Sequence, residues 1–201
     1  MLSPYQLNQF MDYLSLLLKW NRRLNLTALR SVQEIIPKHF LDSLLPLPYI
    51  PQGAKLLDVG SGAGFPGLPI KILRPLQPLT LLESSAKKNS FLKEVIRRLS
   101  LAAVDVRQAY LGKGSSFRPN DDLFDIIITR AVGKPLELLS AAHPYLKTGG
   151  RVLLMQGCKG SARIQEMESQ IVRRGFQLNP PLVLTLPDLE QKRVLLFLEK
   201  G

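Results

Sequence analysis

Hydrophobic and polar residues follow two successive patterns along the chain. Before residue 50 the apolar side chains recur at helical spacing, as in the run Leu7, Phe10, Met11, Leu14, Leu17 and Leu18. Ser3, which precedes a proline and stands three residues before a glutamine, is typical of a helix N-cap. A second helix is predicted to begin at Ser31, to break or kink at Pro37, and to resume over 39–45. Residues 1–50 are therefore expected to form an N-terminal helical subdomain.

From residue 51 onward, short apolar runs alternate with helical patterns. The apolar runs predict strands at 55–59, 79–83, 103–106, 124–129 and 151–155, and the helical patterns between them cover 66–73, 86–99, 135–146 and 160–174. Two later apolar runs, 182–184 and 194–198, have no helix between them and predict an antiparallel hairpin. Residues 51–201 are therefore expected to form an α/β domain with a Rossmann-like sheet of about seven strands, mostly parallel and covered on both faces.

The charge balance points to a polyanionic partner. The 201 residues include 27 Lys and Arg against 16 Asp and Glu, a formal net charge of +11. Such an excess favours nucleic acid above other partners, although a basic surface that merely keeps the protein soluble is an alternative. A protein or small-molecule substrate is disfavoured for the same reason.

Cysteine and hydropathy limit the cellular setting. Cys158 is the one cysteine, so an internal disulfide is excluded and a reducing, cytoplasmic setting is expected. It has no histidine or cysteine neighbour at ligand spacing, so no metal site is expected. Neither a signal peptide nor a membrane span is expected from the apolar runs. No protein partner can be inferred, and a monomer is the default expectation.

The strongest local signal is the segment Asp58-Val59-Gly60-Ser61-Gly62-Ala63-Gly64-Phe65-Pro66-Gly67, which joins the first predicted strand to the first helix of the sheet. Its glycines let the backbone turn sharply and let a ligand approach closely, at an entropic cost that a purely structural turn would not need. Glu83 ends the next predicted strand, where a carboxylate can accept both hydroxyl protons of a ribose. Gly60, Gly62 and Glu83 therefore predict a site for a nucleoside-type ligand at the carboxyl edge of the sheet.

Two ligand classes fit that loop. The stretch 62–67 matches the dinucleotide fingerprint, so a nicotinamide- or flavin-dependent oxidoreductase is one interpretation. Asp58 favours the other, because the ammonium group in the methionine part of S-adenosylmethionine donates hydrogen bonds and seeks a carboxylate near the turn. Residues 1–50 also leave no room for the second domain that dehydrogenases usually carry. We expect S-adenosylmethionine as the cofactor.

Further polar residues are candidates for the reaction or for RNA. Arg130 follows a very apolar strand and should emerge at the carboxyl edge beside the glycine loop, or else be an ordinary surface arginine. His39 either packs inside a kinked helix or contacts the ligands, with Asp42 placed to orient it. Lys159, just past the fifth predicted strand, could meet a phosphate or remain solvated.

The chain resembles the RsmG family, also called GidB or glucose-inhibited division protein B. Three stretches carry the likeness: Asn25-Leu26-Thr27-Ala28 with Lys38-His39-Phe40-Leu41-Asp42-Ser43-Leu44, the loop from Leu57 to Pro69, and Thr129-Arg130-Ala131-Val132. The resemblance implies a class I S-adenosylmethionine-dependent methyltransferase fold. It also implies methyl transfer to N7 of a guanosine in 16S ribosomal RNA, either free or in the small-subunit particle.

The resemblance also implies individual contacts. Cofactor contacts are implied at Gly60, Phe65, Glu83, Ser84, Ser85, Arg130 and the pair Ala109-Tyr110. The family's pair is usually Ala-Glu, so Tyr110 departs from it. Asn25, Lys38 and His39 are implied near the RNA, whereas Lys159 is an RNA candidate from its position alone. Since guanine N7 carries a lone pair at neutral pH, no general base is expected; Arg130, and His39 with it, would position the reactants. A vestigial, purely RNA-binding module remains the rival, which the intact Asp58, glycine loop and Glu83 disfavour.

Overall fold

The structure, a computed structural model, describes residues 1–201 except 113, 119–122, 131–132 and 187–191. One mixed sheet organises the described residues, in the order β3-β2-β1-β4-β5-β8-β6, with β7 also paired to β8. Its strands are β1 (Leu56–Val59), β2 (Leu79–Glu83), β3 (Val104–Gln108), β4 (Phe124–Arg130), β5 (Leu146–Gly157), β6 (Phe176–Leu178), β7 (Leu182–Thr185) and β8 (Lys192–Lys200). The first five are parallel neighbours and β8 is antiparallel to β5, as the alternating pattern predicted.

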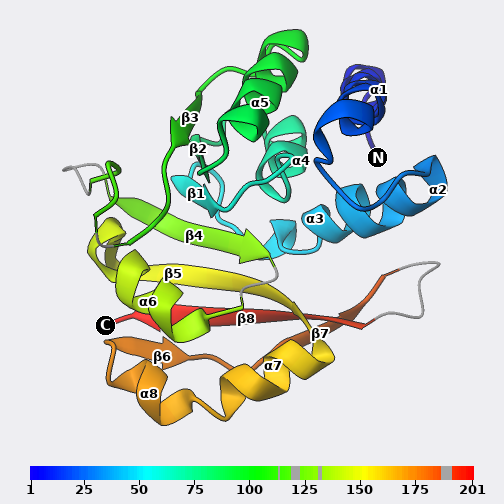
Figure 1. Cartoon of the computed structure of the whole chain (residues 1–201). Helices are drawn as coiled ribbons and strands as arrows, with labels where there is room; N and C mark the ends of the chain where they lie inside the picture. Colours follow the sequence, from blue (N-terminus) through cyan, green and yellow to red (C-terminus); the bar gives the residue numbers. More distant parts are fainter. Residues whose placement is uncertain (113, 119–122, 131–132, 187–191) are drawn as a thin grey trace.

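Helices cover both faces of the sheet (Figure 1). One face carries α1 (Pro4–Leu24), α4 (Gly67–Leu73) and α5 (Ala86–Arg98), and the other carries α6 (Pro135–Ala142), α7 (Cys158–Gln165) and α8 (Glu168–Val172). Alternate strand residues serve the two faces: Ile126 and Ile128 belong to the core on the side of α1, α4 and α5, whereas Ile127 belongs to the core on the side of α6, α7 and α8. Burial on both sides explains why β4 reads as a continuous apolar run.

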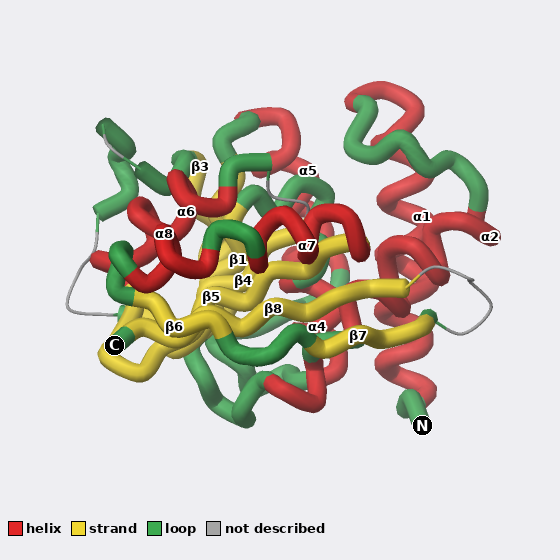
Figure 2. Tube along the Cα trace, turned by 90° about the horizontal axis from the view of Figure 1, so that it is seen from below, coloured by secondary structure: helices red, strands yellow, loops and turns green. Residues whose placement is uncertain are grey.

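The last position of the sheet is split between two short strands. β6 pairs with residues 198–200 of β8, and β7 pairs with residues 192–195 of the same strand. Figure 2 shows β6 and β7 lying end to end along β8. The predicted hairpin of 182–184 with 194–198 is confirmed, and β6 is an addition to it. The sheet thus has seven positions filled by eight described strands.

The N-terminal helices share a core with the sheet. Phe10, Tyr13 and Leu17 of α1 belong to the same buried cluster as Leu68 of α4 and Phe91 of α5. The second helix begins at Val32 as α2 (Val32–Ile35), continues as a π-helical turn, η1 (Ile36–Leu41), and ends as α3 (Asp42–Leu44); a 3-10 turn, η2 (Leu47–Tyr49), follows. The irregular turn contains Pro37, which has no N–H to donate. The expected break does not occur: the helix passes through Pro37 as a π-helical turn.

Several predicted boundaries were wrong. The single helix expected over 160–174 is two helices, because Met167 interrupts it. The helix expected to reach residue 146 ends at Ala142 and is followed by a 3-10 turn, η3 (His143–Tyr145), after which Leu146 already begins β5. β5 is accordingly much longer than the expected strand at 151–155. No helix in the described part of the chain is long and apolar enough to cross a bilayer.

Candidate active site

The glycine-rich loop runs from the end of β1 into the first turn of α4. Gly60, Gly62 and Gly64 have φ angles of +69°, +58° and +94°, in the left-handed region that favours glycine. The hydroxyl of Ser61 donates to the Asp58 carbonyl at 2.9 Å and thereby tightens the turn. A residue with a Cβ would be strained at these angles, so the shape of the loop depends on its glycines.

The four glycines serve two purposes. A Cβ at Gly60 would meet nothing within 4 Å, and one at Gly62 would meet only the Gly60 carbonyl oxygen at 3.8 Å. A Cβ at Gly64 would instead lie 2.6 Å from the Tyr13 hydroxyl, and one at Gly67 would lie 2.8 Å from Asp58 Oδ2. Gly64 and Gly67 thus permit close packing, whereas Gly60 and Gly62 leave open space on the outer side of the loop, where a ligand can approach.

Asp58 lies behind the loop. Its carboxylate is fully buried, and Oδ2 accepts the Gly67 N–H at 2.9 Å, at the N-terminus of α4. Oδ1 is buried without a hydrogen-bond partner. Burial raises the pKa of Asp58 to about 7, against the lowering effects of the Gly67 N–H and of Arg130. Direct pairing of Asp58 with an ammonium group stays a prediction; in the structure this carboxylate braces the loop and keeps one oxygen unsatisfied.

Glu83 is the last residue of β2, the strand next to β1, and lies on the open side of the loop. Its Oε2 accepts the Gly62 N–H at 2.9 Å, and its Oε1 accepts the Ser85 N–H at 2.9 Å. Ser85 caps α5, while Ser84 is exposed beside it. The Ala109 N–H donates to the Glu83 carbonyl at 3.2 Å, which brings the segment after β3 to the same place. The predicted residues from three strands are therefore neighbours at one edge of the sheet.

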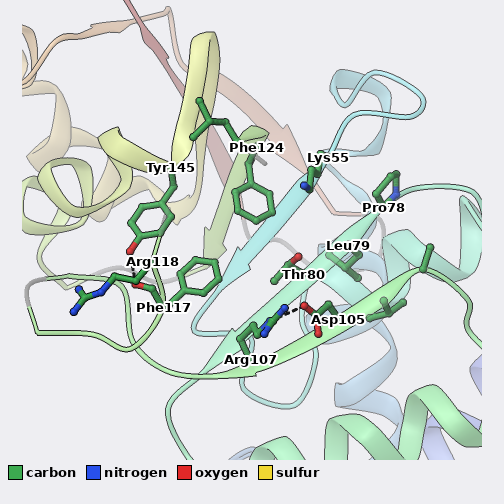
Figure 3. A pocket seen from close by; sticks show the side chains of 13 residues that line it. Lys55, Pro78, Leu79, Thr80, Asp105, Arg107, Phe117, Arg118, Phe124 and Tyr145 are labelled. Atoms are coloured by element: carbon green, nitrogen blue, oxygen red, sulfur yellow. Dashed lines mark hydrogen bonds and ion pairs between the residues drawn. The ribbon is translucent and has the colours of Figure 1, made fainter. Parts of the chain in front are cut away.

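Tyr110 continues from Ala109 into a cavity beside that edge. Its side chain is 53% exposed and lines a hollow of 880 Å³ together with Val59, Leu111 and Leu136. This volume lies within the range of about 300–1,000 Å³ usual for small-molecule sites. A second, smaller cavity of 370 Å³ lies at the opposite, amino edge of the strands, where Arg107 pairs with Asp105 (Figure 3). Only the first adjoins the glycine loop.

Phe65 lies in an aromatic column that ties the loop to the N-terminal helices. Its buried ring stacks on Tyr13 with a centroid distance of 5.4 Å and on His39 with a centroid distance of 4.5 Å. Phe40 packs against it at 5.6 Å. The ring is thus enclosed by protein, and a cofactor contact at Phe65 would have to come from its backbone.

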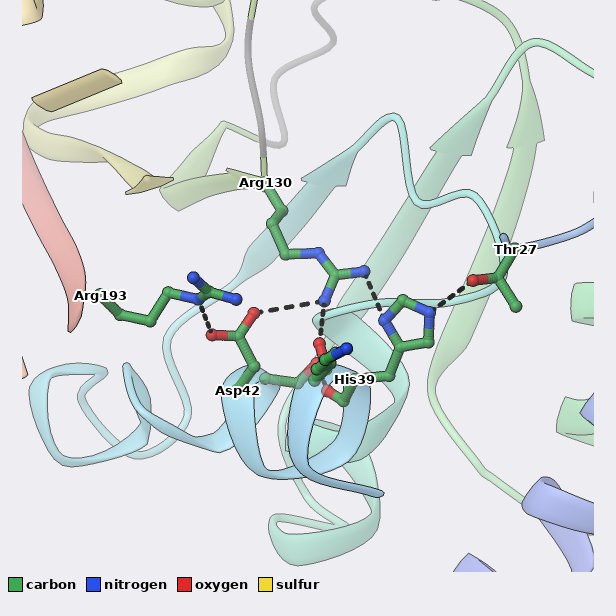
Figure 4. Close-up of polar contacts among 7 residues, drawn as sticks. Thr27, His39, Asp42, Arg130 and Arg193 are labelled. Atoms are coloured by element: carbon green, nitrogen blue, oxygen red, sulfur yellow. Dashed lines mark hydrogen bonds and ion pairs between the residues drawn. The ribbon is translucent and has the colours of Figure 1, made fainter. Parts of the chain in front are cut away.

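Arg130 leaves β4 at the carboxyl edge and reaches the π-helical turn (Figure 4). Its Nη1 donates to the Lys38 carbonyl at 3.2 Å and lies 3.3 Å from Asp42 Oδ2, and its Nη2 donates to His39 Nδ1 at 3.0 Å. Because arginine can only donate, His39 carries its proton on Nε2, which lies 2.7 Å from the Thr27 hydroxyl. Burial, then the Arg130 charge, lowers the pKa of His39 to about 4. His39 is therefore neutral, with both nitrogens engaged.

Asp42 joins two arginines. Its carboxylate is only 3% exposed; Oδ2 faces Arg130, and Oδ1 accepts from Arg193 Nε at 2.8 Å. The expectation that Asp42 orients His39 is wrong, since the side chain orients Arg130 and Arg193. No motif pointed to Arg193, which lies in β8, 151 residues along the chain from Asp42.

The remaining candidates lie further from the loop. Asn25 is exposed and ends α1 in the left-handed conformation. Lys38 pairs with Glu34 at 3.0 Å, and Lys159 is exposed on the first turn of α7. Ala131 and Val132 of the predicted motif lie outside the described residues. Within the described ranges, no three His, Cys, Asp or Glu side chains gather closely enough to hold a metal ion.

Solved structures share this architecture. A SAM dependent methyltransferase from Aquifex aeolicus superposes with a TM-score of 0.63 at 16% identity, covering 82% of this chain and 92% of that one. TYW2 from M. jannaschii, solved in complex with AdoMet, also gives 0.63 at 16% identity, covering 87% of this chain and 80% of that one. At this identity the likeness establishes the fold.

Relatives identified by sequence establish the family as well as the fold. A protein of Lachnoclostridium phytofermentans named ribosomal RNA small subunit methyltransferase G is 38% identical over 99% of this chain and 83% of its own length. Its namesake from Syntrophotalea carbinolica is also 38% identical, over 94% of this chain and 86% of its own length. The family model GidB, described as rRNA small subunit methyltransferase G, matches residues 6–192. With the family model matching most of its length, the chain belongs to the GidB family of methyltransferases.

Proposed function

We propose that this protein transfers a methyl group from S-adenosylmethionine to N7 of a guanosine in 16S ribosomal RNA, in the cytoplasm. The observation that carries the proposal is the family match over residues 6–192, together with the loop and Glu83 at one edge of the sheet. The resemblance of the Lys38–Leu44 stretch and of Arg130 to the family supports the same reaction.

The residues at the loop fit S-adenosylmethionine. The open space over Gly60 and Gly62 admits a ligand against the backbone, and the Glu83 carboxylate has further lone pairs for ribose hydroxyls. The buried Oδ1 of Asp58 has no hydrogen-bond partner, so it is an acceptor available to the ammonium group of the ligand. When bound, this cofactor supplies an electrophilic methyl group on a sulfonium centre.

The chain's own residues need only bind and orient. Guanine N7 has a free lone pair at neutral pH, so no side chain has to remove a proton. His39 is not placed to act as a base, because both nitrogens of its neutral ring are engaged, by Arg130 and by Thr27, and the ring stacks on Phe65. The catalytic contribution would be positional: Arg130 fixes the π-helical turn against the sheet edge and so shapes the approach to the loop.

A basic surface beside this edge supports RNA as the substrate. α1 and α5 lie antiparallel, with the Trp20 and Phe91 rings 5.6 Å apart and Arg98 near Asp12. The last turns of α1 therefore lie beside the first turns of α5, which follow directly on Glu83. Exposed or half-exposed cations gather there: Lys19, Arg22, Arg23, Lys87 and Lys88. Phosphates of a bound RNA would meet them, and binding should weaken steeply with salt.

The direct test uses purified protein, radiolabelled S-adenosylmethionine and small-subunit particles or 16S rRNA from cells that lack the methyl group. We expect label on one guanosine, recovered as 7-methylguanosine after digestion. Absence of label on both RNA substrates, with cofactor binding intact, would refute the proposal.

A further inference from the structure

A cavity of 270 Å³ lies at the carboxyl edge of the sheet, one strand away from the glycine loop. It is bounded by the π-helical turn, by the ends of β4 and β5, and by the start of β8. The side chains that give it its chemistry are Lys38, Asp42, Arg130, Gln156 and Arg193. Because this volume is below the range of about 300–1,000 Å³ for whole ligands, it suits one base of a larger substrate.

Gln156 is the unsatisfied group in this cavity. The residue is 8% exposed, and its Nε2 is buried without a hydrogen-bond partner. A Cβ at Gly160 would lie 2.6 Å from Gln156 Oε1, so the glycine leaves the room that the amide occupies. A buried donor without an acceptor is costly, and such groups in native proteins usually serve a ligand or a bound water. An oxygen acceptor inside the cavity would satisfy it.

The charged side chains favour the same kind of ligand. Arg130 and Arg193 share the single carboxylate of Asp42, so two cations face one anion. Their side chains are mostly buried, with exposed fractions of 24% and 23%. A base that presents a carbonyl oxygen would meet these donors favourably. The exocyclic amine of adenine would meet them donor to donor.

The position of the cavity suits the acceptor of the reaction. β1, which carries the loop, pairs with β4, and β4 pairs with β5, so that Arg130 lies opposite Met155. Neighbouring strands are about 4.8 Å apart, which places Gln156 roughly 10 Å from the loop along the same edge. A base in the cavity and a cofactor on the loop would therefore lie side by side.

We propose that this cavity, the acceptor pocket, receives the base of the target guanosine, with Gln156 Nε2 and Arg193 donating to O6. The two lone pairs of O6 can accept both hydrogen bonds, and N7 keeps its own lone pair for the methyl group. Asp42 is a positioning residue that holds Arg193 in place. The inference rests on the proposed function, since it names how that function selects guanine.

The first test compares Gln156→Leu and Arg193→Gln with matched controls. Gln165→Leu changes an exposed glutamine at the end of α7, and Arg151→Gln changes an arginine paired with Glu199 elsewhere on β5. We expect kcat/KM for unmethylated small-subunit particles to fall by at least ~10-fold in both pocket variants, as for loss of one buried hydrogen bond. Their affinity for S-adenosylmethionine, measured by calorimetry, should stay unchanged, and the controls should transfer normally.

The second test needs no methyl transfer. In protein saturated with S-adenosylhomocysteine, GMP and IMP, which both carry O6, should shift the Gln156 side-chain amide signal in an NMR spectrum, whereas AMP at equal concentration should not. That signal is identified by its absence in Gln156→Leu. Wild-type kcat/KM in both variants, or an amide signal that does not shift when GMP is added, would refute the proposal that the acceptor pocket binds guanine. If the wild type transfers no methyl group to RNA, the proposed function fails, while the GMP titration still decides the pocket.

Discussion

Replacement of Arg130 by alanine removes the side chain that joins the edge of β4 to the N-terminal helices. The guanidinium makes three polar contacts, to the Lys38 carbonyl, Asp42 Oδ2 and His39 Nδ1, at 3.0–3.3 Å. Its carbon also lies 5.5 Å from the centroid of the Phe65 ring. Loss of the side chain leaves the buried Asp42 carboxylate with Arg193 as its remaining cation.

The size of the effect follows from these contacts. A hydrogen bond to a charged group contributes about 1.5–3 kcal/mol, and the long ion-pair distance and partial exposure of Arg130 limit the total. We expect a destabilisation of about 2–3 kcal/mol. For a protein of this size each kcal/mol lowers Tm by about 2–4 °C, so the variant should melt roughly 4–12 °C lower.

Thermal melts beside methyl-transfer assays measure the two consequences separately. Arg130→Lys keeps the charge but loses the planar fork, so it should recover part of the stability and little of the transfer. Arg107→Ala is the control, since its ion pair with Asp105 is exposed on both sides and should contribute less than about 1 kcal/mol. A melting temperature and a transfer rate near wild type for Arg130→Ala would refute the role that the contacts imply.

Three further predictions concern the loop, the buried histidine and the glycines. Glu83→Ala should weaken S-adenosylmethionine binding by about 1.5–3 kcal/mol in calorimetry, because it removes a charged acceptor that also holds the Gly62 N–H; unchanged affinity would contradict the cofactor site. His39 has a folded pKa of about 4, below its unfolded value of about 6.5, so the unfolded state binds more protons between these values. Its contribution to stability, on the order of 3 kcal/mol, is therefore complete above pH 6.5 and lost as the pH falls toward 4; urea unfolding of His39→Gln should show a flatter acid limb than wild type. Gly64→Ala should lower Tm more than Gly60→Ala. Both substitutions strain a left-handed residue, but only the first places a Cβ against packed side chains. Equal losses of Tm would contradict the assignment of Gly64 to close packing and of Gly60 to open space.

The parallel strands and the loop were predictable because their signals are local. The apolar run at Ile126–Ile128 needs two covered faces, and the glycines from Gly60 to Gly67 need positive φ or close packing. Glu83 was found from its place at the end of a strand. Each of these features depends on residues within one or two elements, and such local patterns can be recognised in a single sequence.

The edge of the sheet and the helix after β5 were not predictable in this way. β6 has only three residues, and its pairing with the end of β8 decides its conformation. The interruption at Met167 breaks a pattern that reads as one helix. For β6, tertiary pairing overrides weak local preference.

The side-chain cluster at the π-helical turn was only partly predictable. The family likeness singled out His39 and Arg130, but their direct contact joins residues 91 positions apart. Arg193 and Gln156 carried no motif, and only the fold brings them to the same cavity. The enclosure of Phe65 between Tyr13 and His39 likewise follows from packing and not from spacing.

Mass-spectrometric mapping of 16S rRNA from otherwise identical cells with and without this protein tests the central claim most directly. We predict that one nuclease fragment loses the mass of one methyl group when the protein is absent, and that the modified residue is a guanosine sensitive to the chemical cleavage specific for 7-methylguanosine. Re-expression of wild type should restore the fragment, and Glu83→Ala should restore it poorly. Identical fragment maps in the two strains, or a lost methyl group on a different base, would contradict the account.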